Sequence, residues 1–127
     1  MFNKLEILKM AHGMATHAAA RQSVVARNIA NADTPGFQAQ DITSFKKTYD
    51  DDAGFATRST RSGHIAGSAQ PSDIAAFSDT TADASPNGNS VSLEVEMVKS
   101  VQSKSQHDMA LTVYHSAMGI LRTSLGR

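Results

Sequence analysis

Residues 26–37 read Ala-Arg-Asn-Ile-Ala-Asn-Ala-Asp-Thr-Pro-Gly-Phe, which is the pattern of a helix end followed by a tight turn. Asn31 tolerates the left-handed conformation in which many helices end. Thr34 precedes proline and is therefore pushed away from helical geometry. Pro35 and Gly36 suit the central pair of a type II turn, because proline fixes φ at the first position and glycine accepts positive φ at the second. We therefore expect a helix to stop just before this turn.

Upstream of the turn, from about Asn3 to Ala32, the chain contains no proline and has a helical spacing of apolar and small residues. They are Leu5, Leu8, Ala11, Ala15, Ala18, Ala19, Val25, Ala26 and Ile29. Asn3 is a suitable N-cap, and Glu6 is placed to close a capping box. The many alanines favour close approach of a second helix over a bulky core. Gly13 costs about 1 kcal/mol in a helix, so we expect local looseness there.

A second long helix is predicted from about Ser92 to Leu125. Asn87-Gly88 is a strong turn signal before it, and Ser92 is an acceptable N-cap. Glu94 and Glu96 fall in the first turn, where their charge complements the helix dipole.

Two apolar stripes run along this second helix. The first comprises Val91, Val95, Val98, Met109, Val113, Ala117 and Ile120, and the second Leu93, Met97, Val101, Leu111, Tyr114, Met118, Leu121 and Leu125. A helix that is apolar on two sides needs neighbours on two sides. Because the chain has one other long helix, at least one neighbour must come from another molecule. From both helices we select as the assembly interface Leu5, Leu8, Ala15, Ala19, Val25, Val95, Val98, Val101, Met109, Val113, Met118, Leu121 and Leu125.

The segment between the helices is rich in Ser, Thr, Asp, Gly and Ala, with single scattered apolar residues. Asp50-Asp51-Asp52 and the stretch 78–89 have the composition of solvated, flexible chain, and residues 37–40 alternate weakly like a strand. The predicted fold is mainly α: two long terminal helices that pack as a helical hairpin or coiled-coil-like axial core, with a poorly ordered or weakly β middle. We divide the chain into the N-terminal helix and motif (1–40), a connector (41–90) and the C-terminal helix (91–127).

Composition excludes several functional classes. The chain has 127 residues, and its 12 basic and 12 acidic residues cancel, so no overall field attracts nucleic acid or anionic lipid. It has no cysteine and hence no disulfide or thiolate metal site. We see neither a Sec-type signal peptide nor an apolar run long enough to span a membrane. Aromatic residues make up only 6%, which is thin for a self-sufficient core.

No catalytic, cofactor or metal site is predicted. His12 and His17 are five residues apart, which places them on different helical faces and does not match the His-Glu-x-x-His zinc motif. Glu94 and Glu96 diverge as i and i+2 on a helix, so they do not form a glycosidase pair. We expect a protein that is not an enzyme.

The whole motif is more specific than its parts. Asn28-Ile29-Ala30-Asn31, followed after two residues by Thr34-Pro35-Gly36-Phe37, resembles the signature of the flagellar rod, hook and hook-associated axial proteins. The stretch from Gly88 to Met97 is also similar to the opening of the C-terminal helix in short proximal rod proteins, with Ser92 where aspartate is usual. The FlgC type fits poorly at residues 106–117. The resemblance covers the two ends of the chain and says little about the middle.

This resemblance implies a structural subunit of the proximal rod, part of the axial drive shaft, assembled through its terminal helices after flagellar type III export. It implies a place in the basal-body rod across the periplasm, reached without a cleaved signal peptide. The implied partners are copies of the chain, rod proteins of the FlgC, FlgF and FlgG types, the MS-ring adaptor FliE and the export gate. The alternative is a helical adaptor or export chaperone of the same system, which would fold as a stable dimer in isolation.

Overall fold

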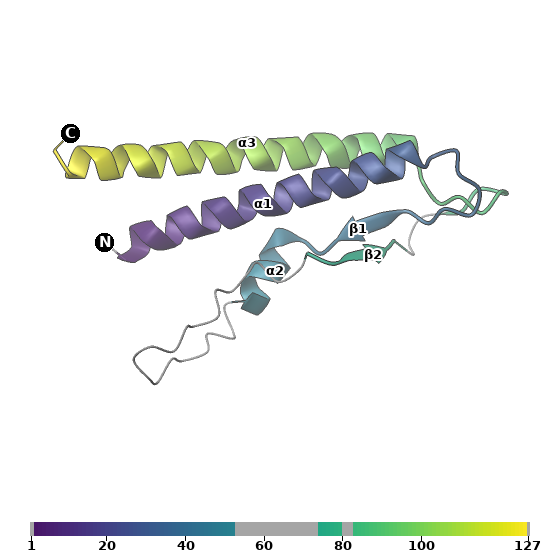
Figure 1. The fold of residues 1–127 in the computed structure, drawn as a ribbon, viewed down its shortest axis with the longest axis horizontal. Helices are drawn as coiled ribbons and strands as arrows, with labels where there is room; N and C mark the ends of the chain where they lie inside the picture. The colour runs from purple at the N-terminus through teal and green to yellow at the C-terminus, as the bar shows by residue number, and fades with distance from the viewer. Residues whose placement is uncertain (1, 53–73, 80–82, 127) are drawn as a thin grey trace.

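The computed structural model describes residues 2–52, 74–79 and 83–126, with side chains for 6–50 of the first range. Along the chain it contains α1 (Phe2–Ala30), β1 (Gln40–Ile42), α2 (Phe45–Asp52), β2 (Ala76–Ser78) and α3 (Leu93–Ser124). The long helices α1 and α3 lie side by side (Figure 1). The prediction of a mainly α fold built on two long packed terminal helices is therefore confirmed.

The two long helices run antiparallel, so that the start of α1 and the end of α3 lie at one end of the molecule (Figure 1). With 29 and 32 residues at 1.5 Å per residue, they are about 44 and 48 Å long. The other end is formed by residues 31–37 and 83–90, which we call the tip. Residues 31–37 follow α1 and contain the Pro-Gly turn, and residues 83–90 precede α3 and contain the Asn-Gly turn.

The surface between α1 and α3 is made of small and polar residues. The buried residues Ala11, Ala18 and Val25 repeat every seven positions along α1. The three buried residues of α3 are Glu96, Ser103 and Ala110, again seven apart. A seven-residue repeat keeps side chains on one side of a helix that packs lengthwise on another. The helices thus meet along a seam that lies between the two apolar stripes of α3.

The middle of the chain contributes a two-stranded antiparallel sheet and a short helix. Gln40 pairs with Ser78 and Ile42 with Ala76, so β1 lies slightly beyond the predicted alternation at 37–40. The ring of Phe45 in α2 rests on α1 near Gly13, where an added Cβ would lie 3.6 Å from it. Asp50-Asp51-Asp52 end α2; the prediction of flexible chain there was wrong, because the preceding residues anchor a helical turn on α1.

The predicted helix ends need two corrections. Because α1 already begins at Phe2, Asn3 lies inside the helix, and the predicted N-cap and capping box were wrong. Among the described residues no non-glycine has positive φ, so the left-handed Asn31 was also wrong. Instead the Asn31 side-chain amide donates to the carbonyl of Arg27 at 2.8 Å, which also accepts from the Asn31 backbone N–H at 3.2 Å.

The turn and the start of α3 agree with the sequence analysis. Gly36 has φ 73°, and the Phe37 N–H donates to the Thr34 carbonyl at 3.2 Å, as a Pro-Gly turn requires. Ser92 occupies the N-cap position with extended backbone, although its side chain makes no capping hydrogen bond. Its carbonyl accepts from the Glu96 N–H at 2.9 Å.

Candidate functional site

At the tip, the side chain of Asn89 joins the end of α1 to the start of α3. Its Nδ2 lies 2.9, 2.8 and 2.8 Å from the carbonyl oxygens of Asn31, Ala32 and Thr34. Its Oδ1 accepts from the Val91 N–H at 2.8 Å. One buried amide thus bonds to three carbonyls of the chain that follows α1 and to the backbone just before α3. The neighbouring Asn87-Gly88 turn was predicted from the sequence, but this role of Asn89 was not.

The two turns of the tip are bonded to each other through their backbones. The Gly36 N–H donates to the Asn87 carbonyl at 3.1 Å, and the Ser90 N–H donates to the Phe37 carbonyl at 3.0 Å. Gly88 has φ 81°, and a Cβ there would lie 3.3 Å from the Cα of Gly36. Both glycines are therefore needed, one for its positive φ and the other for positive φ together with close backbone approach.

Behind the tip, Asn28 is fully buried and joins three elements. Its Nδ2 donates to the Gln40 carbonyl at 2.7 Å and to Glu96 Oε2 at 3.0 Å, while its Oδ1 accepts from the Gln40 N–H at 3.1 Å. The amide of Asn28 therefore pairs with the backbone of β1 as a neighbouring strand would. Glu96 of α3, which is only 1% exposed, accepts the second hydrogen bond from the same Nδ2.

Glu96 opens onto a cluster of five charged residues, the Lys99 cluster. Its members are Arg21 of α1, Asp41 of β1, Asp79 after β2, and Glu96 and Lys99 of α3. The Lys99 Nζ lies 3.2 Å from Asp41 Oδ2 and 3.3 Å from both Asp79 Oδ2 and Glu96 Oε1. The Arg21 Nε lies 3.3 Å from Asp41 Oδ1. Thus α1, α3, β1 and the residue that follows β2 meet at this cluster.

The pKa values of two members reflect these contacts. Burial alone would raise the pKa of Asp41, but the hydrogen bond from the Ile42 N–H and the pairing with Lys99 and Arg21 outweigh it and lower that pKa. Burial alone would lower the pKa of Lys99, whereas its hydrogen bond and attraction to Asp41, helped by Glu96 and Asp79, raise it. Both groups are therefore held in their charged forms.

Comparison with known proteins places this chain in a family. Residues 11–38 match the family described as "Flagella basal body rod protein". The chain is 31% identical over 118 residues to the flagellar basal body rod protein FlgB of Agrobacterium fabrum, covering 88% of this chain and 87% of that protein. It is 35% identical over 108 residues to the FlgB of Salmonella typhimurium, covering 79% and 78%. The FlgB of Yersinia enterocolitica is 34% identical over 103 residues, or 75% of each chain.

The chain belongs to the FlgB family of flagellar basal-body rod proteins. It is accordingly a structural subunit of the flagellar rod. The segment that matches the family model covers most of α1 and the Pro-Gly turn. In the described part of the chain, no helix is long and apolar enough to cross a membrane.

The motif shared with the FlgB family divides into inward-bonding and outward-facing residues. Asn28, Asn31, Thr34 and Gly36 all make hydrogen bonds within the tip and the polar network behind it. Phe37 is half-buried and bonds through its backbone to Thr34 and Ser90. The remaining residues of the motif, Ile29, Ala30 and Pro35, are exposed. The motif therefore closes α1 on the start of α3 and leaves part of its surface open.

The residues selected as the assembly interface are spread along this FlgB-family chain rather than gathered at one site. Val25 is buried, Leu8, Ala15 and Leu121 are half-buried, and Ala19 is exposed. The α3 residues Val95, Val98, Val101, Met109, Val113, Met118 and Leu125 are all exposed. The side chain of Leu5 lies outside the described residues.

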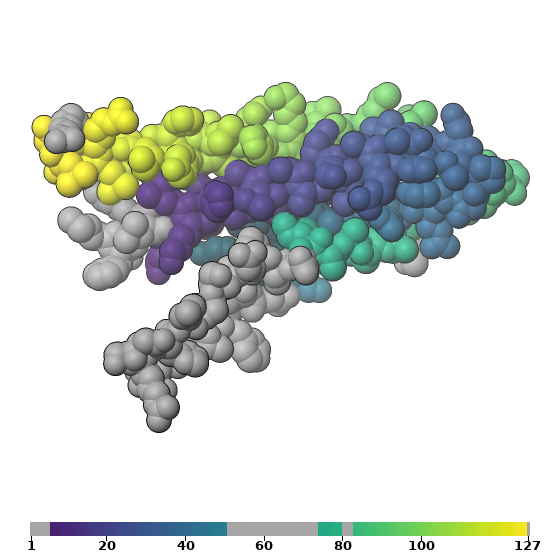
Figure 2. Space-filling view, in the orientation of Figure 1, coloured from purple at the N-terminus to yellow at the C-terminus, as the bar shows by residue number. Residues whose placement is uncertain are grey.

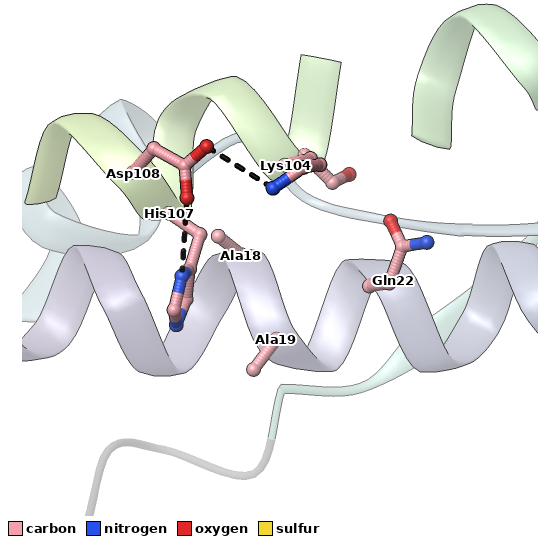
Figure 3. A pocket seen from close by; sticks show the side chains of 7 residues that line it. Ala18, Ala19, Gln22, Lys104, His107 and Asp108 are labelled. Atoms are coloured by element: carbon pink, nitrogen blue, oxygen red, sulfur yellow. Dashed lines mark hydrogen bonds and ion pairs between the residues drawn. The ribbon is translucent and has the colours of Figure 1, made fainter. Parts of the chain in front are cut away.

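One open groove of about 370 Å³ lies between the long helices of the described chain (Figure 3). Its lining consists of Ala18, Ala19, Gln22, Ser103, Lys104, His107 and Asp108. Lys104 Nζ is 3.3 Å from Asp108 Oδ2, and His107 Nδ1 is 4.0 Å from Asp108 Oδ1. The second distance is too long for a hydrogen bond, so these side chains do not form a proton relay in this structure.

Proposed function

We propose that this rod subunit is built into its assembly through the apolar faces of α3 that α1 leaves uncovered. Residues 1–40 and 91–127 would form the axial core and residues 41–90 the connector. Its neighbours would be copies of itself, rod proteins of the FlgC, FlgF and FlgG types, and the MS-ring adaptor FliE. It would reach the rod through the flagellar type III export gate, without a cleaved signal peptide, and the rod would cross the periplasm. Its role there would be mechanical and not catalytic.

The observation that carries this proposal is the exposure of large apolar side chains along α3. Val101 is 70% exposed and Met97 60% exposed. Each square ångström of apolar surface taken from water is worth roughly 25 cal/mol, and monomers rarely leave extended apolar patches uncovered. In the view of Figure 2, no described segment covers the edge of α3 that faces away from α1.

The seam between α1 and α3 explains why this surface remains free for other molecules. α3 buries Glu96, Ser103 and Ala110 against α1, so its internal contact uses hardly any of its bulky apolar residues. Those residues lie on both sides of the seam. One side carries Val98 and Met109, and the other carries Val101 and, further along, Met118. A neighbour on each side would bury them.

The test is incorporation of charged variants into purified basal bodies, with export of each variant measured in parallel. We expect Val98→Glu and Met118→Glu each to be exported but excluded from the rod, because each introduces a carboxylate into an interface that offers it no partner. Val98→Ile is the matched control, since it keeps the same face apolar, and it should be incorporated normally. Normal incorporation of either glutamate variant would show that its side of α3 faces water in the rod.

A further inference from the structure

The Lys99 cluster is the place where the β1–β2 hairpin is fastened to the helix pair. One ammonium group lies within 3.3 Å of carboxylates from β1, from the end of β2 and from α3. The side chains of Asp41, Asp79 and Lys99 are mostly buried and Glu96 is almost completely so. Lys99 is therefore the α3 residue that reaches both strands at once.

The Lys99 ammonium group offsets part of the negative charge of the cluster. Asp41, Asp79 and Glu96 supply three negative charges, whereas Arg21 and Lys99 supply two positive ones. All three carboxylates lie around the Lys99 Nζ and hence close to each other, while Arg21 contacts Asp41. Repulsion between charges at such separations is strong where water is partly excluded. Without Lys99, the carboxylates of the strands and of α3 would push the hairpin away from the helices.

Apolar contacts hold β1 but not β2, so they cannot replace this attachment. On β1, Ile42 and the neighbouring Ala39 are buried, and Gln40 is bonded to Asn28. All three residues of β2 are exposed, including the ring of Phe77. β2 is held by its ladder to β1, continued by the Asp79 N–H donating to the Ala39 carbonyl at 2.8 Å, and by the ion pair of Asp79 with Lys99.

We propose that Lys99 is a positioning residue that fixes the orientation of the β1–β2 hairpin against α1 and α3. It thereby sets how β1 and β2 lie against the two long helices. The hairpin attachment itself rests only on the contacts within one chain, so it can be tested separately from the assembly surface of α3.

The experiment is hydrogen exchange followed by mass spectrometry on purified basal bodies that contain each variant. Lys99→Met removes the charge and keeps an unbranched side chain of similar length. We expect amides of residues 76–79 to exchange roughly tenfold faster or more, while amides in the middle of α1 and α3 keep their wild-type rates. Lys99→Arg should restore protection, because a guanidinium can also bridge carboxylates.

Lys104→Met is the matched control, since Lys104 is an exposed lysine of the same helix whose partner, Asp108, is also exposed. It should leave the hairpin amides unchanged. Two results would overturn the proposal. Unchanged hairpin exchange in Lys99→Met would mean that the ion pairs do not hold the strands. Equal acceleration throughout α1 and α3 would mean that Lys99 supports general stability instead of hairpin position. If Lys99→Met does not enter the rod, hydrogen exchange is measured instead on the purified chain with osmolyte, and the same two results would overturn the proposal.

Discussion

Replacing Asn28 by aspartate tests whether the buried amide network holds the two long helices together. The substitution keeps the shape of the side chain but turns its donor Nδ2 into a carboxylate oxygen. That oxygen would face Glu96 Oε2, which now accepts from Nδ2 at 3.0 Å, and the Gln40 carbonyl, which now accepts at 2.7 Å. Both donated hydrogen bonds would be replaced by repulsive contacts.

The size of the effect follows from these distances. Two unit charges 3.0 Å apart repel by about 5 kcal/mol at an effective dielectric constant of about 20. Leaving the Gln40 carbonyl without its donor adds about 1–3 kcal/mol. Uptake of a proton by one carboxyl would limit the total. The loss is nevertheless comparable with the 5–15 kcal/mol that stabilises an ordinary domain, so we expect Asn28→Asp to separate α1 from α3 at neutral pH.

Disulfide trapping provides the assay. The side chains of Gln22 and Ser100 are in contact across the helix pair, with Nε2 and Oγ 2.9 Å apart, and the chain has no native cysteine. Cysteines at these two positions should cross-link quickly in the otherwise unchanged chain, in the presence of an osmolyte that favours compact states. In the Asn28→Asp background the initial rate should fall at least about a hundredfold.

Two further variants show whether charge is the cause. Adding Glu96→Gln to Asn28→Asp removes the repulsion and lets the new amide donate to the new carboxylate, so trapping should recover substantially. Gln102→Glu makes the same amide-to-carboxylate change at an exposed site on α3 and should have no effect. Trapping of Asn28→Asp at the unmodified rate would refute the role assigned to this network.

Two other predictions concern the cluster and the tip. The pKa of Asp41 is lowered from its usual 3.8, so its contribution to stability is present above pH 3.8 and is lost as the pH falls through the lower pKa of the folded state. The pKa of Lys99 is raised from its usual 10.5, so its contribution is complete below pH 10.5 and is lost as the pH rises through the higher pKa of the folded state. The thermal midpoint followed by circular dichroism should therefore fall at both extremes of pH, and Asp41→Asn should flatten the acid side; an unaltered acid side would contradict the assignment. Gly36→Ala should lower the free energy of unfolding by about 1–2 kcal/mol because Gly36 has positive φ. Gly119→Ala, inside α3 with open space around it, should be neutral or slightly stabilising. Similar destabilisation by both variants would be inconsistent with a specific Pro-Gly turn.

The sequence predicts the long helices and the Pro-Gly turn because both depend on neighbouring residues. Apolar spacing indicates a helix wherever it continues, and Pro35-Gly36 restricts its own backbone. The end of α1 was predicted from the same neighbouring residues, although Asn31 does not adopt the left-handed backbone and instead bonds through its side chain to the Arg27 carbonyl. The two-sided apolar character of α3 was also readable, since it is a property of one helix.

The polar network and the hairpin depend on residues far apart in the sequence and could not be found in the same way. Glu96 was interpreted from the sequence only as a first-turn carboxylate that complements the helix dipole. Its burial requires Asn28 and Lys99 to be in place. β1 and β2 are three residues each, too short for a clear alternation, and they pair across a long stretch of chain. The presence of Asp41 and Asp79 opposite one lysine is visible only once the fold brings them together.

The antiparallel arrangement of α1 and α3 has a practical consequence for labelling this subunit. The beginning of α1 and the end of α3 share one end of the molecule (Figure 1), so fluorescent or affinity tags on the two helix termini would crowd the same neighbours and report on the same junction. A marker for the opposite end must be inserted in the tip. There Asn89 and the bonded turns, which include Ser85, leave residues 83–84 as the exposed position that an insertion would disturb least. Pairing a terminal tag with an insertion there would reveal which end of each subunit points toward the cell body.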